Sequence, residues 1–480
     1  MRFPLLTKLA AMGLVMLLLG AVLLRIDSLV AERRVRQAQA AAGVEDALAG
    51  PQTLLGPLLH RTCTEEWDGT VGEGKEQRRI TERREFMLTA APQALQVAGD
   101  MRAEPRYRGL FKVNSYAGSV LLKAHWDDMG LLQPVAQHTG GRLRCGPLYL
   151  MLSVQDVRGI RSAQVQLGGA PLPVLPGTGH GAYPRGLHAV LPPATGGGPL
   201  DAVVQLQLAG TASLALVPAA GHTRFSLQSD WPHPSFNGRF LPTQRTVAAA
   251  GFDASWDISS LASAAANEVG RNGEVCRSTP PVASQAYGET WVPAPSQKDR
   301  VCMDTLGVAF IDPVNPYVLT DRATKYALLF IVLTFGCVAL TELMSGRRVH
   351  PVQYTLVGLA LALFYLLLLS LSEHIAFDQA YAAASAACVL LLGYYASHML
   401  GRWRAGAGFG AGVALLYGAL WTLLQMEQAA LLIGAVLLFG ALVTVMVLTR
   451  RVNWYTAFAA AKTPPADADA PVPQPASTGR

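Results

Sequence analysis

Residues 347–374 read RRVHPVQYTLVGLALALFYLLLLSLSEH and contain a long apolar run. No charged residue interrupts 352–371, and the run ends on Ser372-Glu373-His374. About 20 such residues match the hydrocarbon core of a bilayer at a rise of 1.5 Å per residue, whereas a soluble helix would show a polar face. We interpret the run as a membrane-spanning helix. The arginines at its start mark the cytoplasmic side, so Glu373 and His374 are expected on the other side.

Most of the apolar residues lie in two parts of the chain. The 480-residue sequence is 51% hydrophobic and 15% charged, whereas about 25% of the residues in a soluble protein are charged. The apolar excess lies near the N-terminus and in 326–448. Many Lys and Arg residues flank these runs, and no basic stripe carries interleaved aromatic residues. We therefore expect the lipid bilayer as a partner and no nucleic acid.

The N-terminal apolar run is expected to be an uncleaved membrane anchor, residues 1–25. Basic residues precede the run 9–24, and Arg25 follows it in place of the small residues that signal-peptide cleavage requires. The N-terminus is therefore expected in the cytoplasm. Residues 26–49 are rich in Ala, Glu, Arg and Gln, which favour helix, and they predict a helical stalk that ends at Gly50-Pro51.

Residues 50–323 are expected to form a large β-rich domain, inserted between the first and second membrane helices. Short, partly alternating apolar segments are separated by Gly- and Pro-rich turns, as in a sandwich or a barrel. Because the anchor begins in the cytoplasm, this domain is expected in the periplasm of a double-membrane bacterium. One helix is expected within it, at 257–266. The expected strands include 94–98, 113–124, 163–167, 202–208 and 212–217.

A block of five further membrane helices is expected at 324–451. Basic pairs at 347–348, 402/404 and 450–451 alternate with Glu373 and Glu427, as the positive-inside rule requires. This pattern predicts an integral protein of the bacterial inner membrane with six transmembrane α-helices and both termini in the cytoplasm. The Pro- and Ala-rich tail, 452–480, is expected to be cytoplasmic and largely disordered. The five predicted helices are 326–343, 352–371, 377–399, 408–426 and 428–448.

Small residues recur in two of these helices and predict close helix packing. Without a hydrophobic drive in lipid, small side chains let helix backbones approach one another. A chance recurrence in a sequence rich in Ala and Gly is the alternative. The residues are Ala382, Ala383, Ala386 and Ala387 in one helix and Gly406, Gly408, Gly410 and Gly412 in and just before the next.

Four of the six cysteines lie in the β-rich domain: Cys63, Cys145, Cys276 and Cys302. Disulfides form in an oxidising compartment such as the periplasm, and the pairings Cys63–Cys145 and Cys276–Cys302 close the shorter loops. Unpaired buried thiols are the alternative, because a domain of this size does not need disulfides for stability. No Cys or His spacing is typical of a zinc site, and we expect no metal and no cofactor.

No catalytic motif is recognisable, and we expect no enzymatic activity. The sequence lacks the G-x-S-x-G, HExxH, Walker and Rossmann fingerprints. The carboxylates beside the membrane helices, including Glu427, fall at predicted helix ends. Glu373-His374 is the most informative pair, because a carboxylate favours the charged form of a neighbouring imidazole. Glu373, His374 and Glu427 are candidates for an interface or for a proton- or lipid-responsive site. Anchoring of helix ends at the headgroups is the alternative.

Long motifs in both halves of the chain carry a family resemblance. In the membrane block they are HPVQYTLVGLALALFYLLLLSLSEHIAFDQAY (350–381), LYGALWTLLQMEQAALLIGAVLLF (416–439) and TRRVNWY (449–455). Earlier ones are GPQTLLGPLL (50–59), RYRGLFKVNSY (106–116), SDWPHPSFNGRFLP (229–242), GFDASW (251–256) and GVAFIDPVNPYVLTDRATKYALLFIVLTF (307–335). With these motifs the chain resembles the CreD family of inner-membrane cell envelope integrity proteins. The resemblance implies the architecture above, a role in envelope homeostasis and expression under a sensor kinase and response regulator. It implies no reaction.

Two functional hypotheses follow from these observations. In the first, which we prefer, a non-enzymatic envelope protein binds an envelope component or a periplasmic protein through its periplasmic domain. In the second, a transporter or lipid-handling protein uses the helix block, which would require polar or charged groups near the membrane midplane. The short connections on both sides of the domain further predict that it docks on the loops at Glu373-His374 and Glu427.

Overall fold

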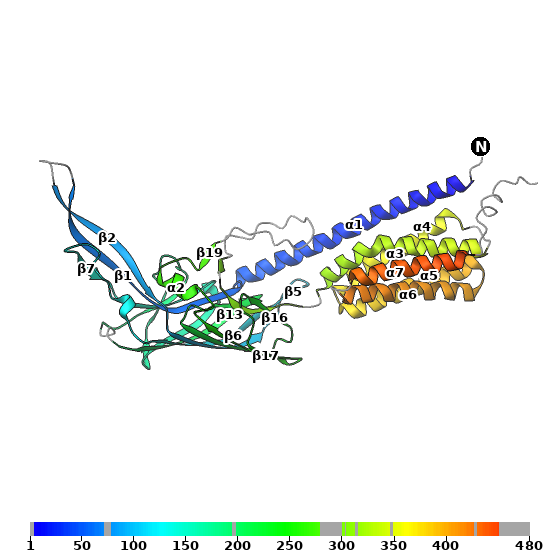
Figure 1. Cartoon of the computed structure of the whole chain (residues 1–480). Helices are drawn as coiled ribbons and strands as arrows, with labels where there is room; N and C mark the ends of the chain where they lie inside the picture. Colours follow the sequence, from blue (N-terminus) through cyan, green and yellow to red (C-terminus); the bar gives the residue numbers. More distant parts are fainter. Residues whose placement is uncertain are drawn as a thin grey trace, which may run out of the picture. The chain divides into compact units, whose positions relative to one another are not determined.

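The chain forms two compact units. The computed structural model describes residues 4–71, 78–193, 198–278, 300–302, 304–312, 315–345, 349–426 and 430–450. One unit, the helix block, combines Met1–Arg34 with Val314–Arg480, and the other, the β domain, is Val35–Pro313 (Figure 1). Each unit is described by itself below.

The first helix, α1, belongs to both units. It spans Pro4–Ala47 without a break, so the expected anchor and stalk form a single helix. It ends shortly before Pro51, whose ring lacks the backbone N–H that a helix interior needs. The end of α1 is fixed within the β domain. Arg158 donates a side-chain hydrogen bond to the carbonyl of Asp46, and the N–H of Gly50 donates one of 3.0 Å to the Asp156 carboxylate.

The β domain is a sandwich of two sheets. In the described residues, nine strands form the first sheet, in the order β11-β12-β8-β1-β14-β21-β16 with β2 and β7 also paired to β1. Eight strands form the second, in the order β10-β9-β13-β6-β3-β15-β18-β17. Leu152 and Leu216 of the first sheet share one core with Val204 and Trp256 of the second. The expected β-rich domain is therefore confirmed, and its form is a sandwich.

The strands of the first sheet are β1 (Gln52–Val71), β2 (Arg78–Ala90), β7 (Arg142–Cys145), β8 (Tyr149–Val154), β11 (Val174–Pro176), β12 (Gly186–Val190), β14 (Ser213–Val217), β16 (Pro234–Gly238) and β21 (Leu306–Phe310). Those of the second are β3 (Ala94–Ala103), β6 (Ser115–Trp126), β9 (Ile160–Leu167), β10 (Ala170–Leu172), β13 (Leu200–Thr211), β15 (His222–Ser229), β17 (Gln244–Ala248) and β18 (Gly251–Ser259). Two small pairs complete the set, β4 (Arg106–Arg108) with β5 (Phe111–Val113) and β19 (Cys276–Ser278) with β20 (Arg300–Cys302). Short helical turns are η2 (Gly130–Leu132) and η3 (Val157–Gly159).

The predicted helix at 257–266 is wrong. β18 continues to Ser259, and the only helix nearby, α2, occupies Ala265–Gly270 within the described residues. Buried and exposed side chains alternate along β18, which is the period of a strand. Asp257 faces outward there, 2.7 Å from the imidazole of His222 on the neighbouring strand. The five predicted strands, in contrast, correspond to β3, β6, β9, β13 and β14.

The helix block holds the first part of α1 and five later helices. These are α3 (Pro316–Ser345), α4 (Pro351–Ser372), α5 (Phe377–Leu400), α6 (Trp403–Gln425) and α7 (Ala430–Thr449). Within the described residues, α1, α3, α4, α5 and α6 are long and apolar enough to span a membrane, whereas the apolar part of α7, Leu432–Val447, is shorter. The chain is thus a membrane protein whose β domain is inserted between the first and the later helices. α3 begins before the predicted residue 326, because the polar residues that precede its apolar run are helical too.

Two of the predicted glycines bring α5 and α6 into close contact. A Cβ added at Gly410 would lie 3.4 Å from the Cα of Gly393, and one at Gly406 would lie 2.5 Å from backbone atoms of Ser397. Around Gly408 and Gly412, in contrast, no atom lies within 4 Å of such a Cβ. The predicted alanines at 382, 383, 386 and 387 are exposed on α5. Close packing therefore depends on one face of α6, which meets Gly393 and Ser397 of α5.

Gly406→Ala is expected to destabilise the helix block by roughly 1–3 kcal/mol, because the added methyl group overlaps the backbone of α5. Gly412→Ala is the matched control, since it adds the same group in open space and should be neutral or stabilising by up to about 1 kcal/mol. Unfolding of the purified protein in detergent measures both. Equal losses in the two variants would contradict the contact between α5 and α6.

Candidate functional site

A three-stranded arm extends from the β domain (Figure 1). β1 continues past the sandwich, where it pairs with β2 from Leu59↔Ala90 onward and with β7 from Cys63↔Cys145 to Glu66↔Arg142. We define the arm as residues 61–71 of β1, residues 78–88 of β2 and β7. Because β1 also pairs with β8 and β14 inside the sandwich, the arm is a direct extension of the first sheet.

One face of the arm is closed by the segment that precedes β7. Glu65 is buried there, with a side chain 1% exposed, and its carboxylate accepts hydrogen bonds of 2.8 Å from the backbone N–H groups of Gln137 and His138. The hydrogen bond from the His138 N–H is the main cause that lowers the pKa of Glu65. The His138 ring also stacks on Trp67, with ring centroids 3.6 Å apart. The Glu65 carboxylate and the two backbone N–H groups satisfy one another, and the stacked rings cover them, so this face is structural, although the buried Nδ1 of His138 has no hydrogen-bond partner.

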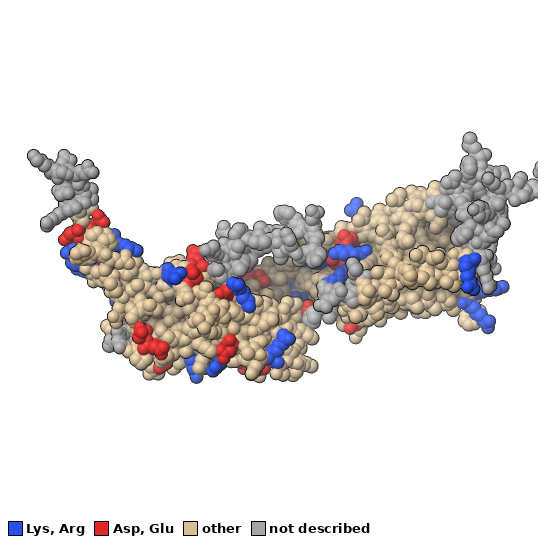
Figure 2. Space-filling model, in the orientation of Figure 1, with Lys and Arg blue, Asp and Glu red and all other residues tan. Residues whose placement is uncertain are grey.

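The other face of the arm carries charges of both signs. Glu66 pairs in register with Arg83 on β2 and with Arg142 on β7. Asp68 lies 3.7 Å from the guanidinium of Arg142, and both side chains are more than half exposed. Figure 2 shows acidic and basic atoms side by side on the arm. Such a face can form ion pairs with a charged macromolecule, and its mixed signs do not favour a purely anionic or purely cationic partner.

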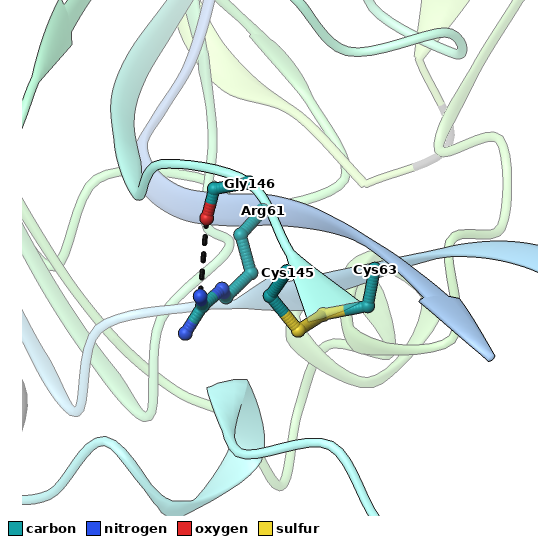
Figure 3. Close-up of a disulfide and its surroundings, with 4 residues drawn as sticks. All are labelled: Arg61, Cys63, Cys145 and Gly146. Carbon is teal, nitrogen blue, oxygen red and sulfur yellow. Dashed lines mark hydrogen bonds between the residues drawn. A yellow bond between two sulfur atoms is a disulfide. The ribbon is translucent and has the colours of Figure 1, made fainter. Parts of the chain in front are cut away.

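A disulfide joins β7 to the arm. The structure bonds Cys63 to Cys145, one of the two pairings expected from the sequence, across directly opposed strand positions. Beside it the Arg61 guanidinium donates a hydrogen bond of 3.0 Å to the carbonyl of Gly146 (Figure 3). The disulfide and this hydrogen bond both link β1 to the β7 strand and the residue after it.

The second predicted pairing involves residues whose side chains lie outside the described part of the chain. The backbones of Cys276 and Cys302 pair in register across β19 and β20. That register is what a disulfide between adjacent strands requires, and the Cys276–Cys302 bond stays a prediction. Among the described residues, Cys337 and Cys388 of the helix block are free thiols.

Two buried histidines lie at the base of the arm. His60 and His180 are 1% and 3% exposed, with their rings 5.5 Å apart edge to face. Nδ1 of His180 accepts a hydrogen bond from the N–H of Ala182, so its Nε2 carries the proton toward the hydroxyl of Thr89. His60 donates from Nε2 to the carbonyl of Thr178 at 2.8 Å, and its buried Nδ1 has no hydrogen-bond partner. Both rings are therefore arranged as neutral imidazoles.

Burial lowers the pKa of both histidines. For His180 the pKa falls to about 4, with burial as the main cause and the neighbouring His60 as the second. The pKa of His60 is lowered mainly by burial too. The sequence gives no local signal of this pair, because the two residues are distant in the chain and neither belongs to a motif. Across the described ranges, no three His, Cys, Asp or Glu side chains are grouped as metal ligands would be.

The structure separates Glu373 from His374, which the sequence suggested as a pair. The Glu373 side chain is 9% exposed and lies 3.4 Å from the guanidinium of Arg33 on α1, and the Tyr317 hydroxyl donates to it at 3.5 Å. His374 is exposed, and its Nδ1 donates to the carbonyl of Ser370 at 3.2 Å. Glu427 lies outside the described residues. Glu373 thus has its polar partners inside the helix block, and docking of the β domain on it stays a prediction.

The contact between Glu373 and Arg33 ties α1 to the end of α4. We expect Glu373→Ala to destabilise the helix block by roughly 1–2 kcal/mol, less than for a fully buried pair because Arg33 is 33% exposed. Arg33→Ala should have a similar effect, and the double variant should lose less than the sum. The control His374→Ala should be neutral. Additive losses in a thermal unfolding cycle in detergent would contradict the ion pair.

Comparison with known proteins gives one consistent result. A family model described as inner membrane protein CreD matches residues 4–455. The chain is 34% identical over 458 residues to the Inner membrane protein CreD of Escherichia coli (strain K12), which covers 95% of each chain.

Among solved structures, an M1 zinc metallopeptidase from Deinococcus radiodurans is 10% identical over 35% of this chain and 38% of its own, with a TM-score of 0.16. Yeast LTA4 hydrolase in complex with bestatin is 11% identical over 33% and 25%, with a TM-score of 0.17. These scores carry no argument, whereas the full-length match does: the chain belongs to the CreD family of inner membrane proteins.

Proposed function

We propose that this chain is a non-enzymatic inner-membrane protein of cell envelope integrity. Its β domain lies in the periplasm and binds an envelope component or a protein partner through the arm. The family match supports the inner-membrane location. The observation that supports binding is the arm itself, which presents an exposed, charged strand face at a distance from the sandwich core.

The proposed topology has six membrane helices with both termini in the cytoplasm. α7 is the sixth, since its described residues are apolar and Arg450 follows it. Arg402 and Arg404 lie at the start of α6, at the end opposite to Glu373 by the alternation of the helices. Figure 2 shows charged atoms at both ends of the helix block and few between them. The β domain then lies on the periplasmic side, where a disulfide such as Cys63–Cys145 is stable.

The interior of the helix block favours anchoring over transport. Two of its buried tyrosines bond to other groups of the bundle. Tyr381 donates a hydrogen bond of 2.6 Å to the carbonyl of Tyr417, and Tyr417 donates one of 3.1 Å to the sulfur of Cys388. Buried polar residues of the described helices are Thr and Ser rather than charged groups. A transporter site would use polar groups that face a substrate path at the midplane, and groups bonded to one another do not meet that need.

Photo-crosslinking in intact cells tests the proposal. A benzophenone amino acid at Arg83 on the arm should yield a discrete crosslinked species, while the same group at Arg224 on β15 should not. Arg224 is a matched control, because it is also an exposed arginine on a strand, with a side chain 60% exposed. The arm species should also disappear when Arg83 is labelled in a Cys63→Ala/Cys145→Ala background. Identical species from Arg83 and Arg224, or none from the arm, would refute binding through the arm.

A further inference from the structure

A short basic hairpin, which the proposed function does not use, is fixed at the two places where the chain leaves the β domain for the helix block. It comprises β4 and β5, residues 106–113, with sequence RYRGLFKV. Arg106 pairs in register with Val113 and Tyr107 with Lys112. We refer to these eight residues as the basic hairpin.

The first attachment is to the chain that leads into α3. The ammonium of Lys112 lies 3.3 Å from the Asp312 carboxylate and 5.4 Å from the centre of the Trp231 ring. Asp312 precedes Pro316, the first residue of α3, by four positions. Four extended residues reach at most about 14 Å. Chain length alone therefore keeps the basic hairpin close to Pro316, whose helix enters its apolar run about ten residues later.

The second attachment is to the stalk part of α1. A Cβ at Gly43 would overlap the guanidinium of Arg108, so this side chain lies directly on the helix. Gly43 follows Arg34, the last residue of α1 assigned to the helix block, by only a few turns. Both chain connections that enter the membrane unit thus contact the basic hairpin, one through Lys112 and one through Arg108.

The tip of the basic hairpin is apolar and exposed. Tyr107 is 68% exposed and Leu110 is 57% exposed, although large side chains of these types are usually at least partly buried. An aromatic ring with a polar hydroxyl, next to an aliphatic side chain, is typical of residues that settle at the boundary between headgroups and acyl chains.

Basic side chains outnumber acidic ones in and beside the basic hairpin. Arg106 lies 2.9 Å from Glu104, and Arg161 lies 3.7 Å from the same carboxylate. Asp230 is a third acidic group beside the hairpin, since its carboxylate accepts a hydrogen bond of 2.7 Å from the N–H of Ala103. The cluster therefore contains four basic groups and three acidic ones, an excess of one positive charge. Its members are Arg106, Arg108, Lys112 and Arg161 against Glu104, Asp230 and Asp312. A surface of this sign attracts anionic headgroups.

We propose that the basic hairpin binds the anionic phospholipid surface of the membrane that the helix block spans. Tyr107 and Leu110 enter the headgroup layer, and the arginines beside them contact lipid phosphates. The two chain connections limit how far the hairpin can lie from that surface, and this raises the effective concentration of lipid around it. The β domain is then held to the membrane at a third point, besides α1 and α3.

Lipid crosslinking of the full-length protein in nanodiscs tests this proposal. A benzophenone amino acid replaces Leu110, and the control carries it at Leu131, a leucine of η2 that is 67% exposed. The discs contain phosphatidylcholine alone or with phosphatidylglycerol. We expect lipid adducts at position 110 and not at 131, with a higher yield in the presence of phosphatidylglycerol. Arg108→Gln should lower the phosphatidylglycerol-dependent yield about fivefold.

Three outcomes would overturn the proposal. They are equal lipid yields at 110 and 131, a yield at 110 that does not respond to phosphatidylglycerol, and crosslinks from 110 to protein alone. The last would identify the occupant as the helix block or a second protein. If Arg108→Gln impairs folding, seen as loss of the Cys63–Cys145 bond, the comparison of lipids in the parent chain still decides the question.

Discussion

Replacing Cys63 and Cys145 together with Ala is expected to cost the β domain about 4 kcal/mol of stability. The disulfide closes a loop with a sequence separation of 82, and loops of this length lose much of their freedom in the unfolded chain when cross-linked. The local effect should be larger than the global one. Within the described residues, β7 pairs only with β1, next to this bond, so the segment before β7 should open first.

Limited proteolysis without reductant measures this opening. The double variant should be cut between η2 and β7, while Cys337→Ala, which removes a free thiol of the helix block, should give the parental pattern. Thiol labelling after unfolding gives a second reading. Only Cys337 and Cys388 should react in the parent protein if Cys276 and Cys302 are also bonded, and four reactive thiols would disprove that second bond. Six reactive thiols would contradict both.

Acidification is expected to destabilise the β domain between about pH 6.5 and pH 4. An unfolded histidine has a pKa near 6.5, whereas burial lowers the pKa of His180 in the folded state to about 4. The unfolded chain therefore binds more protons in this window, and stability falls as the pH falls. For His180 alone the loss approaches about 3 kcal/mol. His60 adds to it in the same direction, since its pKa is lowered too.

Unfolding of the full-length protein in detergent, followed from about pH 7 to about pH 5, tests the histidine pair. His180→Gln should flatten the dependence of stability on pH. His125 is the control. Hydrogen bonding to Asp201 raises its pKa, so its contribution is present at low pH and lost as the pH rises, and His125→Gln should steepen the acid loss slightly. Glu65 acts only at lower pH, where its carboxylate takes up a proton. A slope unchanged by His180→Gln would exclude the proposed cause.

The membrane helices were predictable because length and polarity alone decide them. The uncharged run 352–371 has the length and polarity of a membrane-spanning helix, and the observed helix α4, Pro351–Ser372, agrees with it. Strand positions were also visible from alternation, but their order was not. β1 pairs with strands that follow it closely and with β14, far along the chain, and these partners depend on side-chain fit across the whole sandwich. The helix predicted at 257–266 was placed too early, since 257–259 end β18 and the helix of this region, α2, begins only at Ala265.

The candidate site residues illustrate the same limit. Loop length was enough to favour Cys63–Cys145. Adjacency in sequence suggested Glu373-His374 as a unit, whereas the turn after α4 directs Glu373 toward Arg33 and leaves His374 exposed. No local sequence pattern indicates that Glu373 contacts Arg33 on α1, and none indicates that His60 and His180 form a buried pair. Such contacts join distant parts of the chain, and only the packed fold brings them together.

Reporter fusions determine directly on which side of the membrane each segment of the chain lies. Alkaline phosphatase should be active when it is fused after Asp128 in the β domain or after His374 in the turn that follows α4. The enzyme folds only in the oxidising periplasm. Fusions after Arg404 and after Arg450 should be inactive, and fluorescent-protein fusions at the same positions should fluoresce in the cytoplasm. An inactive phosphatase after Asp128 would contradict the periplasmic β domain. An active one after Arg450 would show that α7 does not complete a sixth span.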